Sequence, residues 1–194
     1  MVKNTIFKQL VIVIFLSIQI GLNAQSRLSL CCWPNVIPQV ERYNNSFDSI
    51  LQTRLGDDYL FRFTAMPSFD PEYALQIESV EKQYYLKVIS FDKNLWYAKD
   101  AAGIHIDECF VELETELAEQ VLYLNKQFID NKIDSVSIGS TIDGDLYQFE
   151  INENGVISCG QIWQPAPDSP LNRFCLLCAH LKDGCLTENK SKNQ

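Results

Sequence analysis

Apolar residues recur at every second position in several short segments, a period that is typical of strands with one buried face. Around residue 60, Tyr59, Phe61 and Phe63 would share one face, and Arg62 and Thr64 would share the other. Residues rich in Pro, Asp, Asn and Gly separate the segments and favour turns. The same pattern predicts strands near 59–66, 72–79, 83–91, 94–98, 145–151 and 156–163.

A different period, of three and four residues, predicts a long helix near 108–129. The acidic residues Glu112, Glu114 and Glu116 lie in its first turns, where the helix dipole favours negative charge. The predicted apolar stripe consists of Phe110, Leu113, Leu117, Val121, Leu124 and Phe128.

Capping residues predict two further helices. A short one follows Ser46 and ends before Gly56. The last one is expected near 170–182, with Ser169 as its N-cap and a proline at its first position. Gly184 is expected to end it.

Strands in two blocks around a helix are typical of the α+β class. The sequence predicts a single antiparallel sheet that is packed on one face by the helices near 108–129 and 170–182. We expect one α+β domain over residues 25–186 and a disordered polar tail over 187–194.

The N-terminus has the layout of a secretory signal peptide over residues 1–24. Lys3 and Lys8 precede an apolar run, and Ala24 is a suitable last residue before cleavage. The mature protein is therefore expected to be exported, either periplasmic or secreted, without stable membrane insertion. An uncleaved N-terminal anchor is the alternative.

Charge narrows the choice of partners. The chain has 16 Lys and Arg and 25 Asp and Glu residues, and cleavage after Ala24 removes two lysines and no acid, which leaves a net charge of −11. Nucleic acid is excluded as a partner because its binding depends on cationic side chains that release counterions. Solubility alone accounts for such an acidic balance. A partner protein with a basic surface, or a divalent cation, is the alternative explanation.

The segment Phe-Cys-Leu-Leu-Cys-Ala-His over 174–180 looks like a metal or redox site. On a helix, however, Cys175 and Cys178 lie in the apolar stripe, and His180 lies on the opposite side, so the three side chains cannot converge on a metal. Cys175 is also more than a turn from the helix N-terminus, where a reactive thiol would gain from the dipole. Packing in the core or disulfide formation is expected instead, and the possible disulfide cysteines are Cys31, Cys32, Cys159, Cys175, Cys178 and Cys185.

His105 and Asp107 are the weak catalytic candidates. They would share one face of a strand, which suits an acid–base pair or two metal ligands, but no third ligand is spaced nearby. The chain has no nucleophile-elbow, phosphate-loop, zinc-protease or EF-hand motif. The sequence therefore predicts no cofactor and no metal.

The segment Asp-Gly-Asp-Leu-Tyr-Gln-Phe-Glu over 143–150, followed by Ile-Trp-Gln-Pro over 162–165 and a helix near 170–182, resembles the C-terminal part of a group of small uncharacterised bacterial proteins. These proteins carry an Asp-Gly-x-x-aromatic-x-x-Glu strand, a strand that ends in Trp-x-Pro, and a closing helix. The resemblance covers about a quarter of the mature chain. It implies a local fold and no activity. The matching positions are Asp143, Gly144, Tyr147, Glu150, Trp163 and Pro165.

These observations predict an exported, non-catalytic binding or protein-interaction module, such as an inhibitor or an immunity protein. Two alternatives stay open. One is a small extracytoplasmic enzyme that uses His105 with Asp107. The other is a carrier that holds an apolar ligand between the sheet and the helices.

Overall fold

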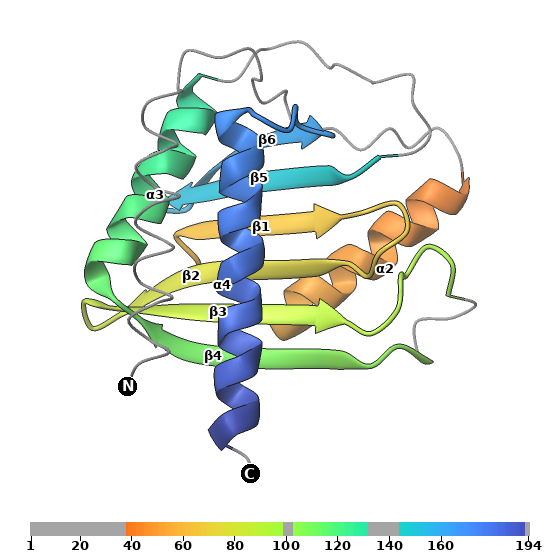
Figure 1. The fold of residues 1–194 in the computed structure, drawn as a ribbon, viewed down its shortest axis with the longest axis horizontal. Helices are drawn as coiled ribbons and strands as arrows, with labels where there is room; N and C mark the ends of the chain where they lie inside the picture. Colours follow the sequence, from red (N-terminus) through yellow and green to blue (C-terminus); the bar gives the residue numbers. More distant parts are fainter. Residues whose placement is uncertain (1–37, 99–102, 132–143, 193–194) are drawn as a thin grey trace.

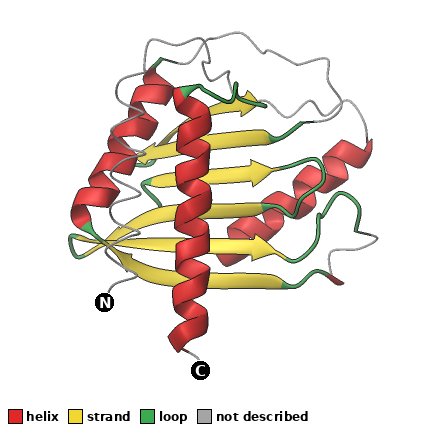
Figure 2. Cartoon of the chain, in the orientation of Figure 1, coloured by secondary structure: helices red, strands yellow, loops and turns green. Residues whose placement is uncertain are grey.

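A computed structural model describes residues 38–98, 103–131 and 144–192 of the chain. In this part, six strands form one antiparallel sheet in the order β4-β3-β2-β1-β5-β6, and three helices pack against it (Figures 1 and 2). The predicted α+β class and single sheet are confirmed. The strands are β1 (Phe61–Met66), β2 (Tyr73–Val80), β3 (Gln83–Phe91), β4 (Ile106–Leu113), β5 (Leu146–Glu153) and β6 (Val156–Trp163); the helices are α2 (Pro38–Arg54), α3 (Thr115–Asp130) and α4 (Pro170–Lys192).

The main core lies between the sheet and the helices α3 and α4, which cover one face as predicted (Figure 1). Phe174 of α4 is its centre, with its ring centroid 6.0 Å from Phe61, 5.4 Å from Phe128 and 5.9 Å from Phe149. Phe63 meets Phe149 edge-on at 5.2 Å. Aromatic pairs at these separations add to the stabilisation that comes from burying their apolar area.

The helix α2 covers part of the opposite face, which the sequence analysis had left open (Figure 2). It begins at Pro38, eight residues before the predicted cap Ser46. Phe47 and Leu51 of α2 pack against Met66 and Ile89 of the sheet. Every residue of β1 is consequently buried, including the polar ones.

The predicted helix near 108–129 is wrong at its start. Residues 106–113 form the strand β4, and α3 begins at Thr115. Phe110 and Leu113 have helical spacing in the sequence, but they lie on opposite faces of β4, with exposed fractions of 55% and 6%. Pairing with β3 satisfies the backbone here, and this tertiary contact overrides the local pattern.

The predicted strand near 94–98 is also wrong, because these residues form a turn. The Asn94 side chain donates hydrogen bonds to the carbonyl groups of Pro67 and Asp70, at 3.0 and 2.8 Å. Such side-chain bonds to the backbone compete with strand pairing. Leu95 points into the core beneath α2, and Trp96 and Tyr97 point to solvent.

The last helix does not end at Gly184. It continues to Lys192, so polar residues that were expected in a disordered tail are helical. Gly184 is not among the glycines with a positive φ and therefore does not form a helix stop. A disulfide joins its neighbour Cys185 to Cys109 of β4 and attaches this part of the helix to the sheet.

Removing this disulfide should lower stability with little change of fold. The bond links residues 76 positions apart, and loops of this size contribute about 2–5 kcal/mol through the restriction of the unfolded chain. Chemical denaturation of the variant Cys109→Ser/Cys185→Ser should show a loss of that order in the free energy of unfolding. A free energy within about 0.5 kcal/mol of the wild type would contradict a stabilising role.

Candidate functional site

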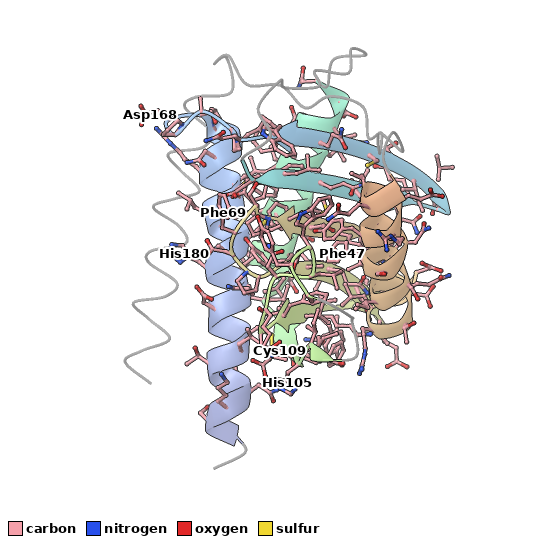
Figure 3. All side chains as sticks on the ribbon, turned by 90° about the vertical axis from the view of Figure 1, so that its right-hand side faces the viewer. Phe47, Phe69, His105, Cys109, Asp168 and His180 are labelled. Carbon is pink, nitrogen blue, oxygen red and sulfur yellow. A yellow bond between two sulfur atoms is a disulfide. The ribbon has the colours of Figure 1, made fainter. Side chains whose placement is uncertain are left out.

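His105 and Asp107 do come together at the start of β4, with Nε2 and Oδ1 3.4 Å apart. Their side chains are 73% and 46% exposed, so water screens the contact. The backbone N–H of His105 donates to Asp92 at 2.8 Å, which positions the segment and leaves the imidazole on the surface (Figure 3). Within the described ranges, no three His, Cys, Asp or Glu residues are placed to hold a metal ion.

The cysteines of α4 face the interior. Cys175 and Cys178 are buried free thiols, and burial raises the pKa of both well above the usual range. Thiols in such surroundings are unreactive because the thiolate is the nucleophile. His180 lies on the outer side of the same helix (Figure 3).

The other candidate cysteines lie elsewhere. Cys185 is bonded to Cys109, and Cys159 of β6 is disulfide-bonded as well. Cys31 and Cys32 lie outside the described residues, as does the predicted signal peptide.

A row of polar side chains crosses the sheet beneath α2. Glu150, Arg62, Gln76 and Lys87 occupy directly paired positions on β5, β1, β2 and β3. Neighbouring positions in such a row have their side chains on the same face. The Arg62 guanidinium donates to Gln76 Oε1 at 3.2 Å from Nε, and its Nη1 lies 3.9 Å from Glu150.

This row binds the C-terminal end of α2. Gln76 Nε2 and Lys87 Nζ donate to the carbonyl of Leu55 at 2.8 and 3.1 Å, and Arg62 Nη2 donates to the carbonyl of Gly56. The last carbonyl groups of a helix lack partners within it and carry partial negative charge. The buried cationic and amide groups are therefore used for attaching the helix.

Glu150, the acidic residue at one end of the row, is also held by neighbouring side chains. Tyr59 donates to Glu150 Oε2 at 2.5 Å, and the Arg62 guanidinium lies 4.0 Å from the centre of the Tyr59 ring. Burial, and secondly the bond to Glu150, raises the pKa of the Tyr59 hydroxyl. Burial, and secondly the charge of Glu150, raises the pKa of Asp48 on α2. Tyr59, Arg62 and Glu150 contact one another, which supports a structural role.

A group of exposed aromatic side chains lies at one end of the sheet. Phe69 follows β1, Trp96 and Tyr97 follow β3, and their exposed fractions are 70%, 37% and 60%. Phe69 and Tyr97 stack on each other, with ring centroids 6.4 Å apart and an 8° angle between the planes. Trp96 meets Tyr43 of α2 edge-on at 5.4 Å. We call Phe69, Trp96 and Tyr97 the aromatic surface.

Buried polar groups hold the two loops of this surface together. Asn94 binds carbonyl groups of the β1–β2 loop and accepts a hydrogen bond from the Trp96 N–H at 3.0 Å. Glu72 is fully buried and accepts from the Leu95 N–H at 2.8 Å and from the Tyr43 hydroxyl at 3.0 Å. Burial raises the pKa of the Glu72 carboxyl, and these hydrogen bonds oppose the shift.

No known protein family, curated protein or solved structure matches the chain. No helix in the described ranges has both the length and the apolar character that a membrane span requires.

The residues that organise both regions give little signal in the sequence. Arg62 and Gln76 read as ordinary polar positions of alternating strands, and only their pairing across the sheet reveals the row. Trp96 and Tyr97 were assigned to a strand. The turn was detectable from Asn94, because asparagine readily bonds the nearby backbone.

The positions that carried the bacterial resemblance have structural roles where the structure describes them. Tyr147 stacks on Phe63 at 5.7 Å in the core, and Glu150 belongs to the polar row. A Cβ at Gly144 would come within 2.5 Å of Trp163 Nε1, so the indole requires a glycine there. Asp143 lies outside the described residues.

The variant Glu72→Gln should change the pH dependence of stability. The raised pKa means that the folded wild type retains a proton that the unfolded chain releases, so the wild type loses stability as pH rises from about 4.5 towards the folded pKa. The variant lacks this loss, and its stability relative to the wild type should increase over the same interval. Denaturant titrations at several pH values between about 4 and 7 would measure this.

The matched control is Glu119→Gln, which makes the same change at an exposed position of α3. Parallel pH profiles for wild type and Glu72→Gln would contradict a buried, ionisable role for Glu72.

Proposed function

We propose that the protein is an exported binding module that recognises a basic protein through the aromatic surface. The observation that carries this proposal is the stacked Phe69–Tyr97 pair, which is exposed on two loops held together by buried Asn94 and Glu72. Aromatic residues are enriched at protein interfaces, and they dominate the energy of binding when a partner covers them.

Rigid support strengthens the argument. A loop that must be ordered on binding loses conformational entropy, and a loop that is already ordered avoids this cost. Here Asn94 and Glu72 bond both loops, and Tyr43 contacts the Trp96 ring from α2. The aromatic surface is therefore prepared for binding before a partner arrives.

Charge favours a basic partner. The mature chain would carry a net charge of −11, and exposed carboxylates of Asp70 and Asp92 lie on the same loops as the aromatic side chains. Lys93 is the cation next to them, and its Nζ lies 3.9 Å from Asp92. An acidic surface speeds encounter with a basic protein and repels acidic ones. The basic n-region and apolar run of residues 1–24 support an extracytoplasmic site of action.

The variant Phe69→Ala/Tyr97→Ala should lose its partner while keeping its fold. Immobilised mature protein would be incubated with the extracytoplasmic fraction of its source cells, and any retained protein purified and titrated. Truncation of interface aromatics commonly costs 2 kcal/mol or more, so we expect binding to weaken by at least about tenfold. Raising the salt concentration should also weaken binding of a basic partner.

The matched control is Val156→Ala/Ile157→Ala, which removes two similarly exposed apolar side chains from the start of β6. It should bind like the wild type. Failure to retain any protein, or equal affinity of the two double variants, would refute the proposal.

A further inference from the structure

The strand β4 forms one outer edge of the sheet in the described part of the chain, with β3 as its only neighbour. The Asp92 N–H donates to the His105 carbonyl at 3.0 Å, so the backbone of His105 points towards β3. Backbone direction alternates along an antiparallel strand. The N–H and C=O groups of Ile106, Glu108, Phe110 and Glu112 therefore point outwards, and we call them the β4 edge.

Asn189 of α4 occupies one position of this edge. Its side-chain amide donates to the Glu108 carbonyl at 2.9 Å, as the N–H of a neighbouring strand would. Beyond Cys185, α4 continues past β4 (Figure 1), and we call residues 186–192 the α4 overhang. If an additional strand paired with the β4 edge, the α4 overhang would cover one of its two faces.

On the opposite face of the sheet, the side chains of β4 beside this position are acidic and aromatic. Glu108 and Glu112 flank Phe110, whose ring is 55% exposed and stacks on Tyr85 with 5.0 Å between centroids. Arg54 pairs with Glu108 at 2.7 Å. Exposed acidic side chains along an edge oppose pairing between two copies of the same strand, because like charges would meet.

From these contacts, we infer that the β4 edge binds an extended basic peptide segment as an additional strand. Its backbone would pair with the outward groups of Ile106, Phe110 and Glu112, in the mode called β-augmentation. Lysine or arginine at alternate positions would face Glu108 and Glu112 and lie over the Phe110 ring, where a cation is favoured. Small apolar residues between them would lie beneath the α4 overhang. This inference is independent of the aromatic surface.

A short synthetic peptide tests it. The probe is the fluorescent, end-blocked heptapeptide Lys-Val-Lys-Val-Lys-Val-Lys, titrated with the full mature protein by anisotropy. We expect saturable binding that weakens by at least about tenfold when the backbone amides of the central valine and of the lysine after it are both N-methylated. One of two consecutive amides points towards β4 whichever way the peptide runs, and N-methylation removes that donor without changing the charge. The peptide with glutamate in place of each lysine should weaken by a similar factor.

Protein variants locate the site. Glu112→Lys should weaken binding of the lysine peptide by about tenfold, since it places like charge beside the added strand. The control Asp168→Lys makes the same charge change at the opposite end of the molecule (Figure 3) and should leave binding unchanged.

Asn189→Ala frees the Glu108 carbonyl and should tighten binding by about fivefold, the equivalent of one hydrogen bond. The control is Thr187→Ala on the same exposed stretch of α4.

Three results would overturn the inference. These are no binding of the lysine peptide, equal binding of the N-methylated peptide, and equal weakening by Glu112→Lys and Asp168→Lys. The second and third would show attraction by net charge alone. None of them bears on the Phe69→Ala/Tyr97→Ala comparison, so the two proposals fail separately.

Discussion

The attachment of the C-terminal end of α2 to Arg62, Gln76 and Lys87 is the contact on which the second face of the sheet depends. Without it, a buried arginine would face an apolar core, and the carbonyl groups that end the helix would lack partners. With it, α2 is held where Tyr43 reaches Glu72. Through Glu72, this contact also supports the loops that display the aromatic surface.

The opposite face is stabilised differently. There α4 crosses the sheet over a core of aromatic rings, and its C-terminal half is attached to the edge strand by the Cys109–Cys185 bond and by Asn189. The helices on the two faces of the sheet therefore support two separate surfaces. The helix α2 supports the aromatic surface, and α4 lies beside the β4 edge.

Elements with one buried face could be predicted from the sequence, because alternation and turn residues report burial directly. The strands β2, β3, β5 and β6 and the helix α4 follow this rule for most of their length. The strand β1 was predicted from the same alternation, although α2 buries its second face as well. The strand β4 does not. Its outward Phe110 interrupts the alternation of buried and polar positions, and its acidic residues read as the start of a helix. Only pairing with β3 identifies it.

The candidate sites were harder to predict than the fold, because each depends on residues that are distant in the sequence. His105 and Asp107 were close in the sequence and did meet, but on an exposed surface. Arg62 and Glu150 are 88 positions apart and become neighbours only through the β1–β5 register. Glu72 and Leu95 are 23 positions apart and become neighbours through the pairing of β2 with β3.

The Cys109–Cys185 bond also divides the chain topologically. It closes a covalent ring between residues 76 positions apart that contains α3, β5 and β6, and it leaves α2 and the strands β1, β2 and β3 outside. A protease that cuts one peptide bond within the ring leaves both pieces joined. In an environment that contains proteases, the segment that carries α3, β5 and β6 therefore tolerates a single cleavage without losing its covalent attachment to the rest of the chain.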